Sequence, residues 1–272
     1  MADAPLVSKA ELKSKDFVPR GNKSSSPVNT TIYLGLRAVD CFWQYLVLSQ
    51  GYGSAVIEFL GGSVIPYGEP LISGIPLIDN LGLSGFRLFI FAMNVIAAGK
   101  HFWFVLRVAE EAWTLPGAVV VGLDNILFDT LNNFLFLCSF TSAASSSAGE
   151  TLDNPYLVVG VALFALGIIA ECVCEIDRKL FKQDTKNKGK PYTGGLFSVV
   201  RHPNYTAFTI WRAGLAVATS GQTYGLLIAS FFMWDFSFRA VPALDEYCSK
   251  RYGDMWADYK KSTVNTLIPF VL

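Results

Sequence analysis

Long apolar runs recur along the chain, separated by short polar or glycine-rich stretches. The cleanest run begins at Pro155, ends at Cys174 and is followed by a charged sequence that starts with Glu175. About 20 mainly apolar residues are needed to cross a bilayer as a helix, so this run predicts a membrane-spanning helix. Three further runs of similar length carry a few internal polar residues and predict spans at 30–50, 86–106 and 116–140.

Two shorter apolar runs lie near the C-terminus, at 204–219 and 222–238. The small and polar residues between them predict a helical hairpin, which brings the expected number of spans to about six. Residues 51–85 are also apolar, but glycines and prolines interrupt them throughout. This pattern predicts a re-entrant or interfacial segment rather than a span.

The positive charges have a one-sided distribution along this arrangement. Lysine and arginine are absent from 38–86, 108–177 and 213–238, and they cluster between 178 and 201. Short loops that are rich in lysine and arginine stay on the cytoplasmic side of a membrane. Six spans therefore place both termini and the basic 175–203 loop on that side. We expect an all-α polytopic bundle with a cytoplasmic cofactor-binding loop and a C-terminal amphipathic helix.

The composition narrows the functional classes. The 272 residues are 52% apolar and only 16% charged, which argues against an ordinary soluble enzyme. The 22 basic residues equal the 22 acidic ones, so no basic field exists for a nucleic acid. Five cysteines and two histidines form no ligand-spaced cluster, so we expect no metal site. The polar residues 1–30 lack the apolar core of a signal peptide and are expected to form a cytoplasmic tail.

Several ionisable or amide residues fall inside the predicted spans. Ionisable groups at membrane depth normally face the interior of a bundle. Two helix faces of this kind suggest a hydrated substrate cavity, while the alternative is hydrogen bonding between helices that only fixes packing. The residues assigned to the cavity are Asn94, Asp124, Asp129 and Asn132.

The region 175–272 carries the recognisable chemistry. A basic loop leads through Gly194 and Gly195 to the sequence Arg-His-Pro-Asn-Tyr at 201–205. Pro203 favours a helix start at this point, so these side chains lie near the membrane surface. They are placed to meet a phosphate or an adenosine, or alternatively to act as an interfacial anchor. In the tail, Tyr252, Trp256 and Tyr259 recur on one helical face.

Over about 95 residues, 175–269, the chain resembles the C-terminal domain of the steroid 5-alpha-reductase family and related sterol reductases. The matching features are Phe181-Lys182, Asn187-Lys188-Gly189-Lys190, Gly195-Leu196-Phe197, the 201–205 sequence, Asp245-Glu246, Cys248, Arg251-Tyr252-Gly253, Trp256, Tyr259 and Ile268-Pro269. Isoprenylcysteine and phospholipid methyltransferases carry a similar Arg-His-Pro element and a similar tail. The chain is thus divided into a polar tail at 1–30, a four-span region at 31–174 and the reductase-like region at 175–272.

The resemblance implies an NADPH-dependent oxidoreductase that reduces a carbon–carbon double bond in a sterol or other lipid taken from the bilayer. In a eukaryotic cell it would reside in the endoplasmic reticulum. Carried over by position, the residues that would hold NADPH are Lys182, Arg201, Asn204, Tyr205, Asp245, Arg251, Tyr252 and Tyr259. Arg201 would grip the 2′-phosphate. Tyr205, His202 and Glu246 are the candidate proton donors.

One departure opens a second interpretation. The reductases follow Asn-Tyr with a large residue, a glycine and a carboxylate, whereas Phe208 occupies the carboxylate position here, and Arg212 lies one turn further on. The proton relay would then need an internal acid such as Asp124 or Asp129. The alternatives are an S-adenosylmethionine-dependent methyltransferase, which the missing carboxylate favours, and a non-catalytic lipid-binding protein.

Overall fold

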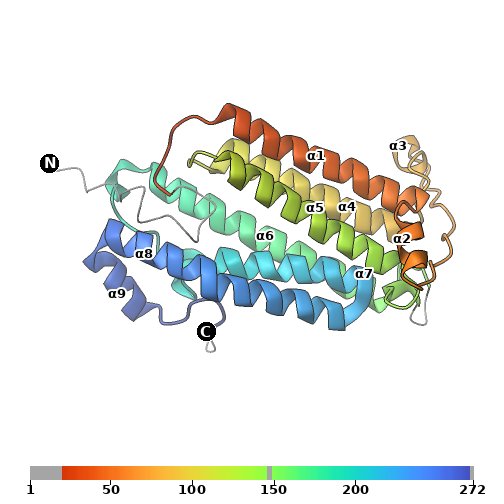
Figure 1. The fold of residues 1–272 in the computed structure, drawn as a ribbon. Helices are drawn as coiled ribbons and strands as arrows, with labels where there is room; N and C mark the ends of the chain where they lie inside the picture. The colour runs from red at the N-terminus through yellow and green to blue at the C-terminus, as the bar shows by residue number, and fades with distance from the viewer. Residues whose placement is uncertain (1–19, 146–148, 270–272) are drawn as a thin grey trace.

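The computed structural model describes residues 20–145 and 149–269, and these residues are almost entirely helical. Five long helices make up the bundle: α1 (Pro27–Gln50), α4 (Gly85–Trp103), α5 (Leu115–Leu137), α6 (Pro155–Gln183) and α7 (Pro203–Asp235). They run side by side in Figure 1. The shorter helices are α2 (Ser54–Phe59), α3 (Pro76–Asp79), α8 (Val241–Tyr252) and α9 (Asp254–Ser262).

Local sequence explains where the long helices begin. Proline occupies the first turn of α1, α5, α6 and α7, where its missing N–H costs no helical hydrogen bond. Side chains cap three of the helices: Ser84 Oγ accepts from the Arg87 amide, Thr114 Oγ1 from Gly117 and Asn154 Oδ1 from Tyr156. The helix ends are thus encoded locally.

Helix α7 reverses direction within its own length. Ser220 and Gly221 leave helical geometry, and Gly221 adopts a φ of 78° that side chains rarely tolerate. The two halves of α7 then run antiparallel to each other. The second half continues through the π-helical turn η5 (Phe236–Ala240) into α8. The hairpin predicted at 219–222 is present in the structure.

Four helical stretches in the described residues are long and apolar enough to cross a membrane: Gly85–Val108, Leu115–Leu137, Pro155–Gln183 and Pro203–Tyr252. The first includes η1 (Phe104–Val108), a π-helical extension of α4, and the last contains the reversal in α7. The prediction of about six spans is therefore not confirmed. Helix α1 is not among the four; its polar residues Arg37, Asp40 and Gln44 lower its mean hydropathy, and all three are buried.

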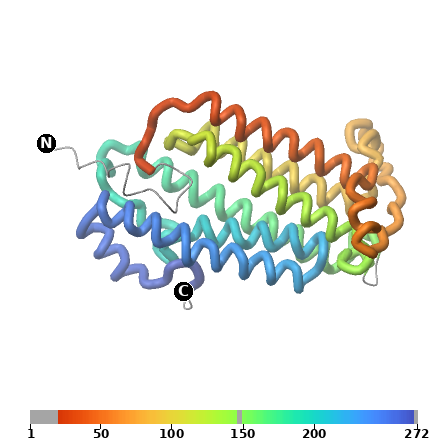
Figure 2. The backbone as a smooth tube through the Cα atoms, viewed as in Figure 1, coloured from red at the N-terminus to blue at the C-terminus, as the bar shows by residue number. Residues whose placement is uncertain are grey.

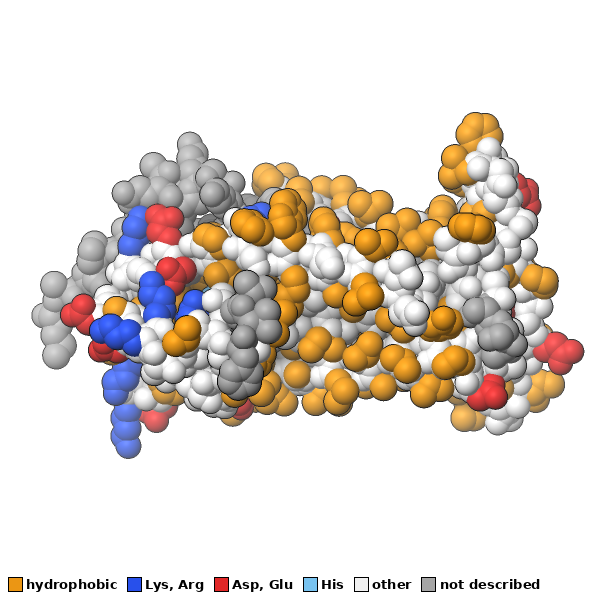
Figure 3. Space-filling model, turned by 90° about the horizontal axis from the view of Figure 1, so that it is seen from below, with side chains coloured by type: hydrophobic (Ala, Val, Ile, Leu, Met, Phe, Trp, Pro, Cys, Tyr) orange, Lys and Arg blue, Asp and Glu red, His pale blue; other side chains and the backbone are white. Residues whose placement is uncertain are grey.

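Apolar and charged side chains are segregated along the bundle axis. In Figure 3, apolar side chains cover the middle of the face, and basic side chains gather at the end that carries α8 and α9. The backbone trace in Figure 2 brings the described N-terminal residues, the α4–α5 turn and the α6–α7 connection to this same end. An integral membrane protein with one basic end is the architecture that these observations show.

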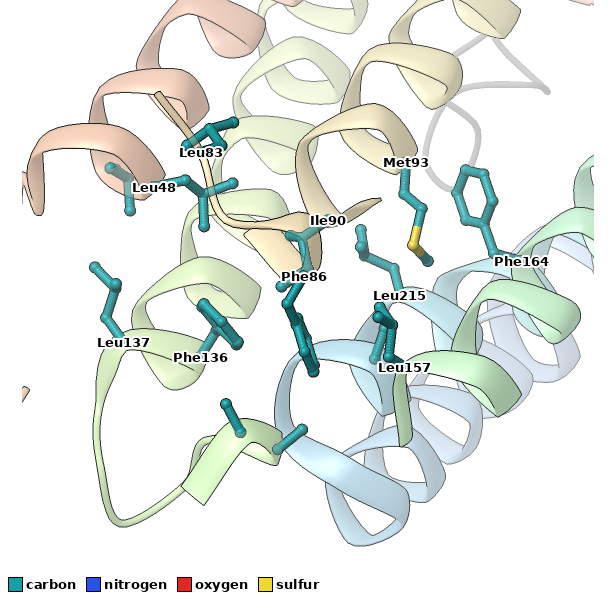
Figure 4. Close-up of a cluster of buried hydrophobic side chains, with 14 of the residues drawn as sticks. Leu48, Leu83, Phe86, Ile90, Met93, Phe136, Leu137, Leu157, Phe164 and Leu215 are labelled. Atoms are coloured by element: carbon teal, nitrogen blue, oxygen red, sulfur yellow. The ribbon is translucent and has the colours of Figure 1, made fainter. Parts of the chain in front are cut away.

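Helices α6 and α7 make the closest contact in the bundle. A Cβ atom added at Gly160, Gly167 or Gly214 would lie 2.5 Å from backbone nitrogen of the facing helix, so only glycine fits there. The main apolar core lies further along, toward the end opposite α8 and α9, around Phe86, Ile90 and Phe136 (Figure 4). The glycine-mediated contact between α6 and α7 holds the C-terminal end of α6 against the start of α7, where the candidate site lies.

Candidate functional site

A pocket of about 320 Å³ lies at the basic end of the bundle, beside α8 and α9. It is built from five parts of the chain that are far apart in sequence: residues 20–23, the α4–α5 turn, the end of α6 with the loop that follows, the start of α7, and helices α8 and α9. Its lining includes Glu110, Glu111, Arg178, Lys182, Tyr192, Phe197, Arg201, His202, Asn204, Cys248, Arg251, Tyr252, Trp256 and Tyr259. Its volume falls in the usual range for small-molecule sites.

The segment at 201–205 is fixed by the end of the chain. The Arg201 and His202 amides donate to the carbonyls of Asn265 and Thr266, both at 3.0 Å. The Arg201 guanidinium donates to the Thr263 and Val264 carbonyls at 2.8 and 2.6 Å and to Thr266 Oγ1 at 2.7 Å. Arg201 therefore holds the C-terminal segment against the start of α7, and it also lines the pocket.

His202 is buried at the first turn of α7 and lines the pocket. Its ring stacks on Tyr205 with 5.6 Å between centroids, and its Nε2 atom has no hydrogen-bond partner among the described residues. Burial, reinforced by the adjacent Arg201, lowers the pKa of His202 to about 3. The imidazole is therefore neutral at physiological pH. Its Nε2 atom is a hydrogen-bonding position that no described residue uses.

An aromatic wall closes the pocket on the side of α8 and α9. The Trp256 indole donates to Asp245 Oδ1 at 2.7 Å, and the Tyr259 hydroxyl donates to the Phe197 carbonyl at 2.6 Å. Trp256 and Tyr259 pack edge to face with 5.2 Å between ring centroids, and both are buried. Tyr252 extends this wall. Hydrogen bonds therefore hold Trp256 and Tyr259 in place, and all three rings belong to the lining of the pocket.

Opposite charges meet on the remaining walls. Arg178, Lys182 and Arg251 face the carboxylates of the α4–α5 turn across the pocket. Glu110 pairs with Lys23, and this hydrogen bond lowers the pKa of Glu110. Behind the wall, the buried Glu175 carboxylate bonds to Arg178 and accepts from Asn204 Nδ2 at 3.3 Å. Glu175 thus orients two of the lining side chains.

The structure brings together most of the predicted cofactor residues. Lys182, Arg201, Asn204, Arg251, Tyr252 and Tyr259 line the pocket. The other two support it: Tyr205 lies between the rings of His202 and Phe236, and Asp245 holds Trp256. Of the predicted proton donors, His202 reaches the pocket, whereas Glu246 is exposed and pairs with Lys250 at 2.9 Å.

The predicted cavity residues belong to a different part of the bundle. Asp129 is fully buried and bonds to Arg37 at 3.1 Å and to Arg212 at 2.7 Å. Asn94 and Asn132 are buried, and each leaves its side-chain oxygen without a partner among the described residues. Asp124 lies on the exposed side of α5. Arg212, which is unexpected inside a span, therefore forms an ion pair with Asp129 of α5.

Sequence reasoning missed the contribution of the α4–α5 turn to the pocket. Glu110 and Glu111 form an acidic pair directly after a predicted span, and this doublet among basic loops was the available signal. Tyr192 was missed as well, because a tyrosine in a loop carries no positional signal. Within the described ranges no group of histidine, cysteine or acidic side chains could hold a metal ion.

Comparison with known proteins identifies the chemistry of the relatives. The family model described as "Protein of unknown function (DUF1295)" matches residues 100–263. The chain is 71% identical over 256 residues to the probable O-methyltransferase ustE of Ustilaginoidea virens, covering 93% of this chain and 90% of that protein. No solved structure matches significantly.

More distant similarity extends to isoprenylcysteine methyltransferases. The chain is 30% identical over 79 residues to protein-S-isoprenylcysteine O-methyltransferase of Schizosaccharomyces pombe, covering 29% of this chain and 33% of that protein. It is 25% identical over 166 residues to protein-S-isoprenylcysteine O-methyltransferase A of Arabidopsis thaliana, covering 55% and 82%. These names contradict the predicted oxidoreductase and leave NADPH and a sterol substrate without support.

Proposed function

The chain belongs to the DUF1295 family, and from that membership and its pocket we propose that it is a membrane-embedded O-methyltransferase that uses S-adenosylmethionine. The relative that is 71% identical along nearly the whole chain carries the name of a probable O-methyltransferase. The observation that carries the proposal is the pocket itself, where an aromatic wall stands beside basic and acidic side chains.

The lining residues fit the chemistry of S-adenosylmethionine. The cofactor has a flat adenine, a sulfonium cation and an amino-acid end with both charges. The faces of Tyr252, Trp256 and Tyr259 suit the adenine and the cation, because aromatic rings attract both. Arg178 and Lys182 suit the carboxylate, and Glu111 suits the ammonium group. The unmatched Nε2 of His202 adds one hydrogen-bonding position.

When bound, the cofactor would supply an electrophilic methyl group to an acceptor oxygen and would leave as the neutral thioether S-adenosylhomocysteine. The chain contributes orientation and exclusion of water. Arg201 fixes the start of α7 to the C-terminal segment, and the buried aromatic wall removes solvent from one side of the pocket. His202 stays neutral, since burial depresses its pKa, so the imidazole adds no positive charge beside the cationic sulfonium.

The finer arrangement is also part of the proposal. Six helices would cross the bilayer, with both termini and the pocket on the cytoplasmic side, and the acceptor would be a lipid that enters from the bilayer. The gathering of basic side chains at the pocket end supports this orientation. In a eukaryotic cell the protein would reside in the endoplasmic reticulum. Residues 1–30, 31–174 and 175–272 would act as tail, supporting bundle and catalytic region, with Glu110 and Glu111 added from the bundle.

A ligand-binding experiment tests the proposal. Purified protein in detergent is melted with S-adenosylmethionine, with NADPH and without ligand. Binding to the folded state by a ligand at 100 times its Kd stabilises it by about 2.7 kcal/mol, which raises the Tm measurably. We expect S-adenosylmethionine to raise the Tm and NADPH to leave it unchanged. A shift with NADPH alone would refute the proposal, and a shift with neither would favour a non-catalytic lipid-binding protein.

The activity arm uses a labelled methyl group. Membranes that contain the protein are incubated with methyl-labelled S-adenosylmethionine and host lipid extract, and label in the organic phase is measured. Trp256→Ala should lose cofactor-dependent stabilisation and methyl transfer together, because its ring forms the centre of the aromatic wall. Lys261→Ala, on the exposed side of the same helix, is the matched control.

A further inference from the structure

Residues 71–83, which we call the apolar loop, lie between α2 and α4 at the end of the bundle opposite the pocket. The loop contains α3, which stands apart from the long helices in Figure 1. Its neck is closed by the antiparallel bridge between Pro70 and Ser84 and by the Leu71 amide, which donates to the Leu83 carbonyl at 2.8 Å. The Tyr45 hydroxyl of α1 also donates to the Leu81 carbonyl at 3.1 Å. The loop is therefore fastened to the bundle at its base.

The polar groups of the loop are largely bonded within it. Asp79 accepts hydrogen bonds from the amides of Ser73 and Gly74 at 2.8 and 3.1 Å and from the Ser73 hydroxyl at 2.7 Å. The amides of residues 75 and 78–82 donate to acceptors inside the loop as well. Internal pairing of this kind is what a backbone needs where water is scarce, because unpaired peptide groups are costly in lipid.

The apolar side chains at the tip of the loop are exposed to the surroundings rather than packed within the loop. Ile72 is 89% exposed and Leu77 is 80% exposed, while Leu83 at the neck is buried in the core. Exposed apolar side chains that cluster on an otherwise self-bonded loop mark a contact surface. The loop has no basic residue, and none occurs between Arg37 and Arg87. An electrostatic attraction to anionic partners is therefore not the basis of the contact.

The position of the neck identifies the contacting phase. Ser84 caps α4, and the stretch Gly85–Val108 is one of the four long enough to cross a membrane. The apolar loop therefore ends where a candidate span begins. The charged Asp79 remains at the tip with three hydrogen bonds, which suits the headgroup boundary better than the hydrocarbon centre.

We propose that the apolar loop is an interfacial anchor, which inserts Ile72, Ile75 and Leu77 into the acyl–headgroup boundary of the leaflet opposite the pocket. The loop lies beside the start of a candidate span and carries no basic residue, so a zwitterionic bilayer supplies its partner without any further protein. The loop lies outside the residues that match the family model, 100–263, so it is a feature of this chain beyond that common region. It would hold the α1–α4 end of the bundle at a set depth.

Photolabelling of the unmodified protein tests the depth. The protein is reconstituted in phosphatidylcholine vesicles with a trace of one of two diazirine phosphatidylcholines, one with the diazirine near the glycerol and one with it at the acyl terminus. After irradiation, adducts are located by peptide mass spectrometry. We expect the shallow probe to label residues 71–83 and the deep probe to label them weakly. Leu127, exposed near the middle of α5, should show the reverse preference, and α9 should remain unlabelled by both.

A paired substitution provides the second arm. In Ile72→Asn with Leu77→Asn, shallow labelling of the loop should fall to the level seen in α9, while α5 labelling stays unchanged and reports an intact bundle. The anchor is overturned if wild-type α5 is labelled and the loop is not, because water, another copy or another protein then covers the tip. Equal labelling of the loop by both probes would also overturn interfacial insertion.

Discussion

The interior charge cluster allows a stability prediction with a worked magnitude. Asp129 has no exposed surface and bonds to both Arg37 and Arg212, which come from different helices. In Asp129→Asn, each arginine loses its ionic partner on α5, although Arg37 keeps Asp40 and Arg212 keeps the side-chain Oδ1 of Asn125. Removing one member of a buried ion pair typically costs about 3–5 kcal/mol. We expect a loss of this size in the free energy of unfolding.

The assay is reversible unfolding in mixed detergent micelles, followed by loss of helicity. Asp124→Asn is the control, because Asp124 lies on the exposed side of the same helix and its replacement should change stability by less than about 0.5 kcal/mol. A second variant combines Asp129→Leu with Arg212→Met, which removes a whole pair and leaves Arg37 with Asp40. It should be more stable than Asp129→Leu alone, since an apolar pair of similar volume often replaces a buried ion pair without loss.

The result also separates the two interpretations of these polar residues. If Asp129→Asn folds within about 0.5 kcal/mol of the wild type, the ion-pair reasoning is refuted. If stability is retained while methyl transfer is lost, the residues line a substrate cavity. If the variant fails to accumulate and the paired replacement restores it, the cluster fixes packing between α1, α5 and α7.

Three other predictions follow from the pocket and its supports. Glu175→Gln should raise the concentration of S-adenosylmethionine needed for half-maximal stabilisation, because Glu175 orients Arg178 and Asn204, and it should also lower the ligand-free Tm, because Glu175 is a buried ion-pair partner; an unchanged half-maximal concentration would contradict the orienting role. His202 has a folded pKa of about 3 and an unfolded value near 6.5, so below pH 6.5 only the unfolded chain takes up the proton. Stability should then fall by about 1.4 kcal/mol per pH unit between pH 6.5 and 3, and His202→Phe should flatten this part of the pH profile; an unchanged slope would contradict the assignment. Gly214→Val should disrupt the α6–α7 contact and prevent folding, whereas Gly99→Val, where an added Cβ meets nothing, should be tolerated when both are compared by expression and size-exclusion chromatography.

The helices were predictable where hydrophobic runs and local caps agree. The Pro155 start of α6 and the reversal at Ser220 and Gly221 follow directly from apolar length, proline and glycine. The predicted number of spans depended on counting α1. Arg37 and Asp40 lower the mean hydropathy of α1. Arg37 pairs with Asp40 and with Asp129 of α5, so the burial of these residues cannot be inferred until the partner helix is known. Tertiary ion pairs of this type leave no local signal in the sequence.

The pocket was predictable only in its C-terminal half. The residues at 201–205 and the aromatic tail recur in a recognisable order, and the structure brings them together. Glu110 and Glu111 reach the pocket because α4 and its extension η1 pack against α6, which is a consequence of helix packing across about 70 residues of sequence. The role of Arg201 was also invisible, since its acceptors are backbone carbonyls of residues 263 and 264.

The departure at Phe208 has a different meaning in the structure than it had in the sequence. Phe208 does not line the pocket; it packs on Trp211, Phe232 and Phe236 inside the bundle. Its ring also lies 5.4 Å from the Arg212 guanidinium, one helical turn further along α7. A carboxylate at 208 would stand at the i, i+4 position to Arg212, where it could pair with it. Asp129 supplies that negative charge from α5 instead, so the missing carboxylate concerns the charge balance of the interior and carries no information about the cofactor. The choice of a methyltransferase over a reductase therefore depends on the relatives and on the pocket walls, and binding of S-adenosylmethionine is the measurement that decides it.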